Sequence, residues 1–188
     1  MEKKRYKILI TGVAGFLGSH LSEKLIELGH TVVGIDNMVG GYKDNIPSNV
    51  EFHNVDCCDL SKIKQLMKNI DIVYHCAATA HEGLSVFSPH EITKNNYLAS
   101  VSIFSAAINE KVKRIIFCSS MARYGDQQTP FTEEMKPKPV DPYGVSKVAS
   151  EQVLKIEKSI NKLKFEDYYN NYKEYLRVIS LEEFKKMF

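Results

Sequence analysis

Short apolar runs alternate with segments of helical periodicity along the first two thirds of the chain. Each run is flanked by charged residues or glycine, which is typical of buried parallel strands. Between the first two runs, four leucines in residues 17–28 recur at helical spacing, and Gly29 stands where such a helix ends. The strands predicted from the apolar runs are 6–11, 31–35, 50–55, 71–77 and 114–118.

A longer helical pattern covers about residues 91–110, just before the last predicted strand. Strands that alternate with helices at this interval predict a parallel sheet with right-handed crossovers. We therefore predict a Rossmann-like, doubly wound α/β fold in three layers, with helices on both faces of a parallel sheet.

Four prolines in residues 126–142 predict a loop, after which a helix opens at Tyr143. Its apolar stripe continues beyond residue 155, and residues 175–179 fit either a continuing helical pattern or a sixth strand. The chain thus divides into a main domain, 1–155, and a divergent helical tail, 156–188.

Length and composition limit the classes of protein that this chain can be. At about 150 residues per domain, 188 residues that are 44% apolar form one substantial core. The 25 basic and 23 acidic side chains are well mixed and leave a net charge of +2, which attracts neither nucleic acid nor an anionic membrane. The four cysteines lack metal-site spacing, and there is no leader or apolar run of about 18 residues. We expect a cytoplasmic protein without metal, membrane or nucleic-acid binding.

The first predicted strand leads directly into a glycine loop, GVAGFLG at 12–18, and then into a helix. Glycines let the backbone approach a pyrophosphate, and a helix amino terminus offers free N–H groups and a positive dipole end. A glycine triplet alone is more often an ordinary turn. Its place between a strand and a helix favours a dinucleotide site.

An acidic residue follows the glycine loop at the spacing of a ribose ligand. Asp36 stands 18 positions after Gly18, at the tip of the second predicted strand. A carboxylate there repels a 2′-phosphate, so we predict NAD rather than NADP. The alternative for Asp36 and Asn37 is a simple strand-ending turn. Asp56 ends the third predicted strand, where it either contacts the adenine edge or is solvated. The side chain of Cys57 beside it is expected to pack in the protein interior.

Tyr143 and Lys147 lie four positions apart, so a helix places both on one face. An ammonium near a phenol stabilises the phenolate, which lowers the tyrosine pKa from about 10 toward neutral pH. Ser120 ends the fifth predicted strand, at the sheet edge where ligands collect. These three residues predict a site that removes a hydroxyl proton while hydride passes to a nicotinamide. Without the glycine loop, the same pattern would be common on helix surfaces.

With these residues, the chain resembles the extended short-chain dehydrogenase/reductase family, in particular its NAD-dependent nucleotide-sugar epimerase/dehydratase branch. The resemblance covers residues 6 to about 155. It rests on TGVAGFLGSH at 11–20, DN at 36–37, HCAA at 75–78, Asn95, SS at 119–120, YG at 124–125 and PYGVSK at 142–147. In that family the serine four positions before Tyr-Gly is the catalytic one, which selects Ser120.

The residue pattern and the resemblance together imply the site and its partners. The catalytic residues are Ser120, Tyr143 and Lys147. The NAD-binding residues are Gly12, Gly15, Phe16, Leu17, Gly18, Asp36, Asn37, Asp56, Cys57, Cys76, Ala77, Ala78, Asn95, Tyr143 and Lys147. The resemblance also implies a nucleotide-sugar substrate and a homodimer joined through the 91–110 helix and the Tyr143 helix.

The reaction implied by the resemblance is oxidation of a sugar hydroxyl to a transient ketone and return of hydride to the opposite face, as in a UDP-glucose 4-epimerase. Dehydratases of the family carry an acidic pair directly after the catalytic serine. Here Met121 and Ala122 stand there, which favours epimerisation. Arg123 is either a contact to substrate or partner, or a solvated side chain. His81 and Glu82 are placed to reach the sugar, although such a loop pair is more often inert.

Members of that family usually continue into a carboxyl-terminal lobe that binds the nucleotide-sugar, and little of this chain follows residue 155. The alternative function is therefore a truncated, non-catalytic NAD-binding module, or half of a split enzyme. The retained Ser120, Tyr143 and Lys147 favour an enzyme, because cofactor binding alone requires no acid/base phenol.

Overall fold

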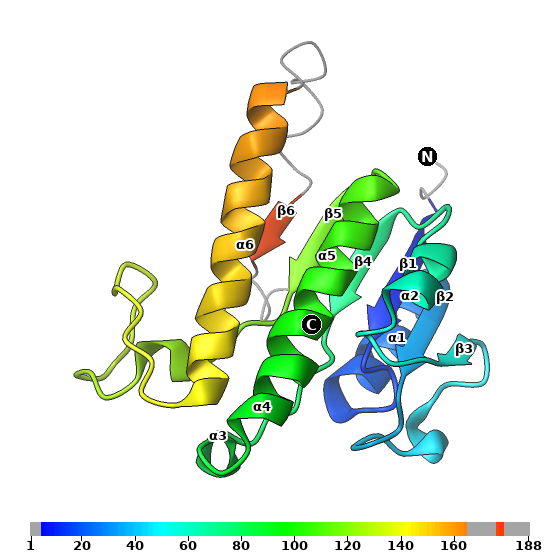
Figure 1. The fold of residues 1–188 in the computed structure, drawn as a ribbon. Helices are drawn as coiled ribbons and strands as arrows, with labels where there is room; N and C mark the ends of the chain where they lie inside the picture. The colour runs from blue at the N-terminus through cyan, green and yellow to red at the C-terminus, as the bar shows by residue number, and fades with distance from the viewer. Residues whose placement is uncertain (1–4, 165–175, 179–188) are drawn as a thin grey trace.

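A computed structural model describes residues 5–164 and 176–178 of the chain. Its centre is a parallel six-stranded sheet in the order β3-β2-β1-β4-β5-β6 (Figure 1). The strands are β1 (Lys7–Thr11), β2 (Thr31–Asp36), β3 (Glu51–Asn54), β4 (Ile72–His75), β5 (Arg114–Phe117) and β6 (Leu176–Val178). The predicted Rossmann-like fold is confirmed.

Helices connect the strands and cover both faces of the sheet. The α-helices are α1 (Phe16–Glu27), α2 (Leu60–Leu66), α3 (Glu82–Ser85), α4 (Pro89–Ile92), α5 (Ala99–Asn109) and α6 (Pro142–Lys164). Short 3₁₀ segments are η1 (Lys43–Asn45) and η3 (Met121–Tyr124), and η2 (Thr93–Leu98) is π-helical. Local chemistry sets several ends: Asp59 caps α2 by accepting from the Lys62 amide, and Gly29 follows α1 with φ +89°.

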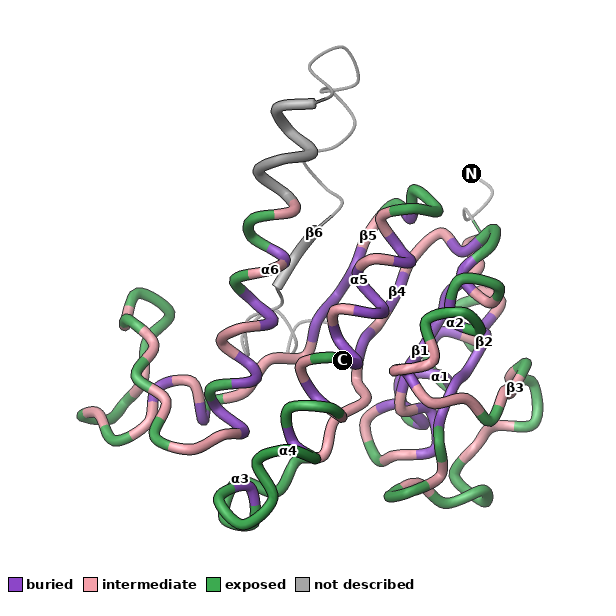
Figure 2. Tube along the Cα trace, viewed as in Figure 1, coloured by how far each residue is buried: buried purple, intermediate pink, exposed green. Residues whose placement is uncertain are grey.

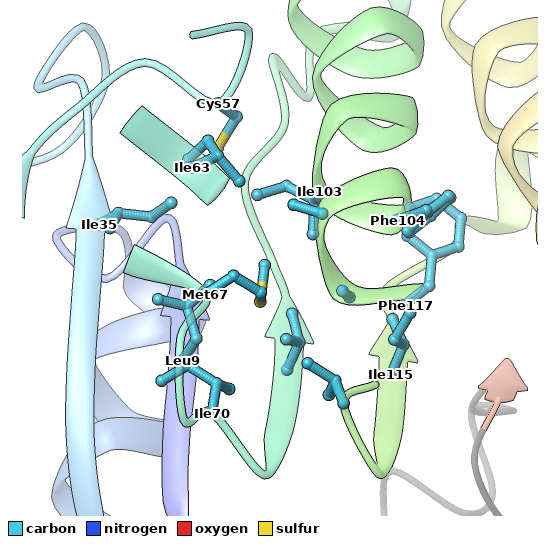
Figure 3. Packing of buried hydrophobic residues seen from close by; sticks show 14 of the residues in the cluster. Leu9, Ile35, Cys57, Ile63, Met67, Ile70, Ile103, Phe104, Ile115 and Phe117 are labelled. Atoms are coloured by element: carbon cyan, nitrogen blue, oxygen red, sulfur yellow. The ribbon is translucent and has the colours of Figure 1, made fainter. Parts of the chain in front are cut away.

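Two apolar clusters fill the spaces between the layers. The larger lies between the sheet and α2, α5 and α6, and Leu9, Ile103 and Phe117 belong to it (Figure 3). The smaller lies between the sheet and α1 and includes Ile10 and Leu21. Buried positions concentrate in β1, β2 and β5 and on the inner sides of α1 and α5 (Figure 2). Burial on both faces explains why these strands are continuous apolar runs rather than alternating ones.

The chain reverses its winding direction at β1, which pairs with β2 on one side and with β4 on the other. Ile8 is opposite Val32 of β2 and Ile72 of β4. In such sheets, ligands bind outside the carboxyl ends of the strands at this switch point. The glycine loop, α3, η3 and the start of α6 all gather at that end of the sheet (Figure 1). The fold therefore brings together the segments that the sequence marks as functional.

The structure changes two expectations about the helices. The pattern over 91–110 is not one regular α-helix, because the π-helical segment η2 separates α4 from α5. The tail 156–188 is not entirely helical: α6 extends to Lys164, but residues 176–178 form β6, parallel to β5. The strand alternative is thus correct for residues 176–178. The remaining tail residues lie outside the described part of the chain.

No helix in residues 5–164 has the length and apolar character needed to cross a membrane.

Candidate active site

The glycine loop is held tightly between β1, β2 and β4. The amides of Gly12 and Val13 both donate to the Ile35 carbonyl, at 2.8 and 3.3 Å. Gly12 has φ +70°, and a Cβ there would lie 2.9 Å from the Ala77 backbone. A Cβ on Gly18 would lie 2.1 Å from the Gly12 carbonyl oxygen. Glycine is therefore required at both positions by backbone contact alone.

The amino terminus of α1 has the properties of an anion site. Its N-cap residue is Gly15, no side chain caps the helix, and its first turn carries no acidic residue. Phe16 in that turn is 81% exposed and lies against the His20 ring. The first-turn amides of Phe16 and Leu17 thus keep the unpaired donors and positive dipole end that suit a pyrophosphate.

Asp36 lies beside this loop, at the end of β2, and is buried. Its carboxylate accepts from the Ala14 amide at 3.0 Å and from the Met38 amide at 2.8 Å. The Met38 bond belongs to the strand-ending turn that was the alternative role for Asp36. The Ala14 bond ties the carboxylate to the glycine loop. Asn37 is exposed and accepts from the Val39 amide at 3.2 Å. The carboxylate is thus fixed at the loop, where each of its oxygens keeps further acceptor capacity.

The end of β3 contributes Asp56 and Cys57. Asp56 is half-buried and accepts from the Cys58 amide at 2.8 Å. The Cys57 side chain packs in the larger apolar cluster, where burial, with the Asp56 charge as a smaller cause, raises the pKa of its thiol to about 12. Only the main chain of Cys57 is therefore available to a cofactor.

A buried hydrogen-bonded relay runs under the segment that follows β4. The Thr11 hydroxyl accepts from the Ala77 amide at 3.0 Å and lies 2.7 Å from His75 Nδ1. His75 Nε2 lies 2.9 Å from the Ser100 hydroxyl, which itself donates to the Asn96 carbonyl. With these protons assigned, Thr11 donates to Nδ1 and Nε2 donates to Ser100, which is the neutral tautomer. Sequence reasoning did not single out Ser100, and it used Thr11 and His75 only as parts of motifs.

Asn96 continues this relay into the loop after β4. Its side chain accepts from the Thr79 amide at 2.7 Å and donates to the Thr79 carbonyl at 3.2 Å, and it is buried. The predicted residue, Asn95, is half-buried and donates to the Thr79 hydroxyl at 3.3 Å. The structure thus shows both asparagines on Thr79, with Asn96 as the buried one. Cys76, Ala77 and Ala78 are held immediately before this anchor.

His75 makes folding stability dependent on pH. Burial, with a smaller effect of the Lys147 charge, lowers the pKa of His75 to about 3, against about 6.5 in an unfolded chain. The unfolded state therefore binds the extra proton between these values, and stability falls as pH falls through this window. From pH 6.5 to 5 we expect His75 to remove about 2 kcal/mol from the free energy of unfolding.

Urea unfolding at both pH values measures this loss. The matched variant is His75→Gln, whose amide can both donate and accept but does not titrate. Its stability should fall less over the same interval. An equal fall in both proteins would show that other groups cause the pH dependence.

The three predicted catalytic residues meet at the carboxyl end of β5. Ser120 is the N-cap of η3, where its hydroxyl accepts from the Ala122 amide at 3.1 Å and lies near enough to the Tyr143 phenol to affect the pKa of that phenol. Tyr143 is buried in the first turn of α6. Lys147 follows one turn later, with its ammonium 5.7 Å from the centroid of the Tyr143 ring. The sequence prediction that these side chains lie together agrees with this geometry.

The ionisation of Tyr143 differs from expectation. Burial raises the pKa of its phenol above the usual 10, the neighbouring Ser120 hydroxyl lowers it, and the nearby charges of Glu82, Asp141 and Cys118 raise it further. The predicted lowering by Lys147 is wrong for this structure, since the ammonium is directed elsewhere. Tyr143 is thus a neutral phenol at pH 7 that can donate a hydrogen bond.

Lys147 is directed at the end of β5. Its ammonium donates to the Cys118 carbonyl at 2.8 Å and lies 4.9 Å from the centroid of the Phe117 ring. Burial lowers the pKa of Lys147 to about 8, so it remains largely protonated at pH 7. The Cys118 thiol lies 3.7 Å from the Cys76 thiol, and their interaction lowers the pKa of Cys118 and raises that of Cys76. Lys147 is thus the buried cation of the site.

Three further candidate residues from the sequence, Arg123, His81 and Glu82, differ in their surroundings. Arg123 is neither solvated nor free for a ligand, because it forms an ion pair with the buried Glu151. His81 and Glu82 are exposed at the start of α3, and Glu82 acts on Tyr143 through its charge alone. Among the described residues, no three or more His, Cys, Asp or Glu side chains gather as metal ligands do.

Comparison with known families decides the classification. The sequence pattern of the NAD dependent epimerase/dehydratase family matches residues 8–165, which is most of the chain. The chain belongs to this family. Within the epimerase/dehydratase family, similar curated proteins include the UDP-glucose 4-epimerase of Streptomyces lividans, 32% identical over 79% of this chain and 46% of that protein. The putative UDP-glucose 4-epimerase of Methanocaldococcus jannaschii is 36% identical over 79% of this chain and 50% of that protein.

Solved structures of the family have the same fold. A UDP-glucose 4-epimerase of Thermotoga maritima, determined with UDP-glucose, superimposes with a TM-score of 0.80 at 30% identity, over 92% of this chain and 54% of that one. The Thermus thermophilus UDP-glucose 4-epimerase, determined with NAD, gives 0.79 at 29% identity, over 92% and 53%. The chain thus spans about half the length of the relatives that it matches.

The residues present fit NAD, the cofactor in the family's name. The glycine contacts leave a cradle without Cβ atoms at Gly12 and Gly18, and α1 presents an uncapped amino terminus beside it. Asp36 stands at the neighbouring strand end as a fixed carboxylate. This donor and acceptor set suits a pyrophosphate and a ribose diol.

Proposed function

We propose that this chain is the NAD-binding and catalytic half of a nucleotide-sugar 4-epimerase. The observation that carries the proposal is the meeting of Ser120, Tyr143 and Lys147 at the end of β5, on the same sheet edge as the glycine loop. The relatives that bear the name UDP-glucose 4-epimerase support a UDP-hexose as the substrate.

Each catalytic side chain has one role in this proposal. NAD supplies a hydride acceptor that is regenerated in each cycle. Tyr143 must first lose its own proton, because its phenol is neutral in this structure. As the phenolate it takes the proton of the sugar hydroxyl and later returns it, and the hydroxyl of Ser120 hydrogen-bonds the same substrate oxygen. Lys147, held by the Cys118 carbonyl, supplies a positive charge that stabilises negative charge as it develops on the substrate oxygen. Of the residues after Ser120, Met121 is exposed and Ala122 is buried, so no carboxylate stands there to protonate a leaving group.

The first test is calorimetric titration of the purified chain with NAD and, separately, NADP. We expect NAD-selective binding, followed by interconversion of UDP-glucose and UDP-galactose by the chain or by the chain with its complementary lobe. Binding of neither dinucleotide would refute the proposal. Selective NAD binding without turnover in either arrangement would favour the alternative function.

That alternative is a non-catalytic NAD-binding module or one half of a split enzyme. It is supported by the coverage of about half of each relative. The distinguishing experiment compares turnover by the chain alone with turnover after addition of a separately expressed carboxyl-terminal lobe of a relative. Recovery of activity only in the mixture would identify a split enzyme.

Asp36 is proposed to set the cofactor preference. Replacing it with alanine removes the negative charge that repels a 2′-phosphate, so the ratio of NADP to NAD dissociation constants should fall at least about tenfold. The matched variant, Asp36→Asn, keeps the shape and one acceptor for the Ala14 or Met38 amide, and should lose discrimination as well. Calorimetry with both dinucleotides measures the ratio. An unchanged ratio in both variants would exclude this role.

Two further expectations, a homodimer and a location in the cytoplasm, also belong to this proposal. A homodimer is supported by a groove of about 490 Å³ between η2 and α6, bordered by Tyr97, Val140 and Val145, and by exposed apolar side chains such as Leu98 on the same helices. Light scattering of the purified chain measures its molecular mass, which should be that of two chains. Location in the cytoplasm remains a prediction from composition.

A further inference from the structure

One buried carboxylate joins the serine-bearing segment to the catalytic helix. Glu151 of α6 is 1% exposed. One of its oxygens lies 2.9 Å from an Arg123 guanidinium nitrogen, and the other accepts a hydrogen bond from the Ser119 hydroxyl. The Arg123 side chain is itself only 16% exposed. The residues on both sides of Ser120 are thus attached to a single side chain of α6.

The carboxylate lies in line with the catalytic residues. Tyr143, Lys147 and Glu151 follow one another at intervals of four, so they share one face of α6. Arg123 follows Ser120 by three positions on η3, and its amide donates to the Ser120 carbonyl at 3.3 Å. The ion pair therefore links the turn that carries the hydroxyl to the helix that carries the phenol.

Arg123 is also held in place by its other neighbours. Its second terminal nitrogen donates to the Tyr124 hydroxyl at 3.3 Å, and its guanidinium lies 5.0 Å from the centroid of the Tyr124 ring. Its carbonyl accepts from the Lys138 amide at 2.9 Å. A planar guanidinium can satisfy an ion pair and stack on a ring at once, which an ammonium cannot do as well. These contacts fix the guanidinium of Arg123 on η3, from which its ion pair reaches Glu151 of α6.

We propose that Arg123 and Glu151 are positioning residues that set the separation between the Ser120 hydroxyl and the Tyr143 phenol. This inference rests on the proposed function, because the separation matters only if both groups bind one substrate oxygen. Ser120 caps a single 3₁₀ turn, whose place against α6 depends on side-chain contacts such as those of Arg123, whereas Tyr143 lies on a long helix. A displacement of about 1 Å in such an arrangement can cost about 100-fold in rate.

The chain offers a matched control for charge at Glu151. Lys155 lies 3.6 Å from the same carboxylate, but from the solvent side, and its side chain is 63% exposed. It has no contact with η3 among those that the structure shows for the described residues. Removing Lys155 therefore takes one cation from Glu151 and leaves the link to the Ser120 turn intact.

Kinetics of four variants test the proposal. In Arg123→Met and Glu151→Gln we expect kcat to fall about 10- to 100-fold while KM stays within about twofold, because positioning affects the chemical step. Arg123→Lys should recover part of kcat, and Lys155→Met should keep kcat within about twofold. Loss of thermal stability with unchanged kcat in Arg123→Met would overturn the proposal, as would an equal loss in Lys155→Met.

Crystal structures of Arg123→Met and of the unmodified protein, both with NAD, test the positioning without turnover. We expect η3 to move relative to α6 and the distance between the Ser120 hydroxyl and the Tyr143 phenol to increase. An unchanged Ser120–Tyr143 distance would refute the positioning role. Absence of turnover by the unmodified protein, both alone and with its complementary lobe, would instead count against the proposed function, and the two structures would still decide the role of Arg123.

Discussion

Replacing Tyr143 with phenylalanine is expected to lower turnover of a UDP-hexose by at least about 10³-fold in any form of the protein that is active. The phenol lies beside the Ser120 hydroxyl and can exchange a proton with a sugar hydroxyl. Removing a positioned acid/base group typically costs 10² to 10⁴ in rate. The ring itself remains, so the packing of α6 against Ile92 and Ala122 is kept.

The same variant should bind NAD within about threefold of the unmodified affinity, because the pyrophosphate and ribose contacts lie on α1 and β2. Coupled assay of UDP-glucose formation and calorimetry with NAD measure the two quantities. Ser120→Ala is the matched variant with a smaller expected loss of turnover, since it keeps the phenol and removes only the neighbouring hydroxyl. Equal turnover by Tyr143→Phe and the unmodified protein would remove Tyr143 from the mechanism.

The second large effect is expected at the glycine loop. In Gly18→Ala, the new Cβ would lie 2.1 Å from the Gly12 carbonyl oxygen and 2.9 Å from the Val13 Cα. Both neighbours are backbone atoms that hydrogen bonds to Ile35 hold in place, so the loop must change shape. We expect NAD affinity to fall at least about 100-fold, because the displaced amides no longer converge on the pyrophosphate.

A second glycine, just after the same helix, provides a control that distinguishes loss of NAD affinity from loss of folding stability. Gly29 follows α1 with φ +89°, and a Cβ there has no neighbour within 4 Å. Gly29→Ala should therefore lose about 1 kcal/mol of stability through backbone strain and keep its NAD affinity. Thermal unfolding with and without NAD reports both effects, since bound ligand raises the midpoint. A full NAD-induced shift in Gly18→Ala would contradict the proposed pyrophosphate cradle.

The glycine loop and the pairing of Tyr143 with Lys147 could be predicted from sequence because each depends on short spacings. A glycine triplet between a strand and a helix, or Tyr143 and Lys147 one turn apart, has a local geometry that the residue order determines. The strands were predictable for a similar reason: burial on both faces produces apolar runs such as that of β2. Their bounds moved by one or two residues, which is usual where ladders end.

The relay from Thr11 through His75 to Ser100 could not be predicted in this way. Its first two residues are 64 positions apart, and only the parallel register of β1 and β4 places them side by side. The ion pair of Arg123 likewise depends on how η3 packs on α6. The raised pKa of Tyr143 depends on burial, which spacing along a helix does not reveal.

The central position of β1 also determines the order in which this fold can assemble during synthesis. The β2 partner of Ile8 is Val32, 24 residues later in the chain, whereas its β4 partner is Ile72, 64 residues later. An emerging amino-terminal β1-α1-β2 unit therefore waits with one edge of β1 unpaired until β4 leaves the ribosome. During that interval this apolar edge is the part of the nascent chain most open to wrong pairing, and a chaperone that shields β1 should raise the folding yield.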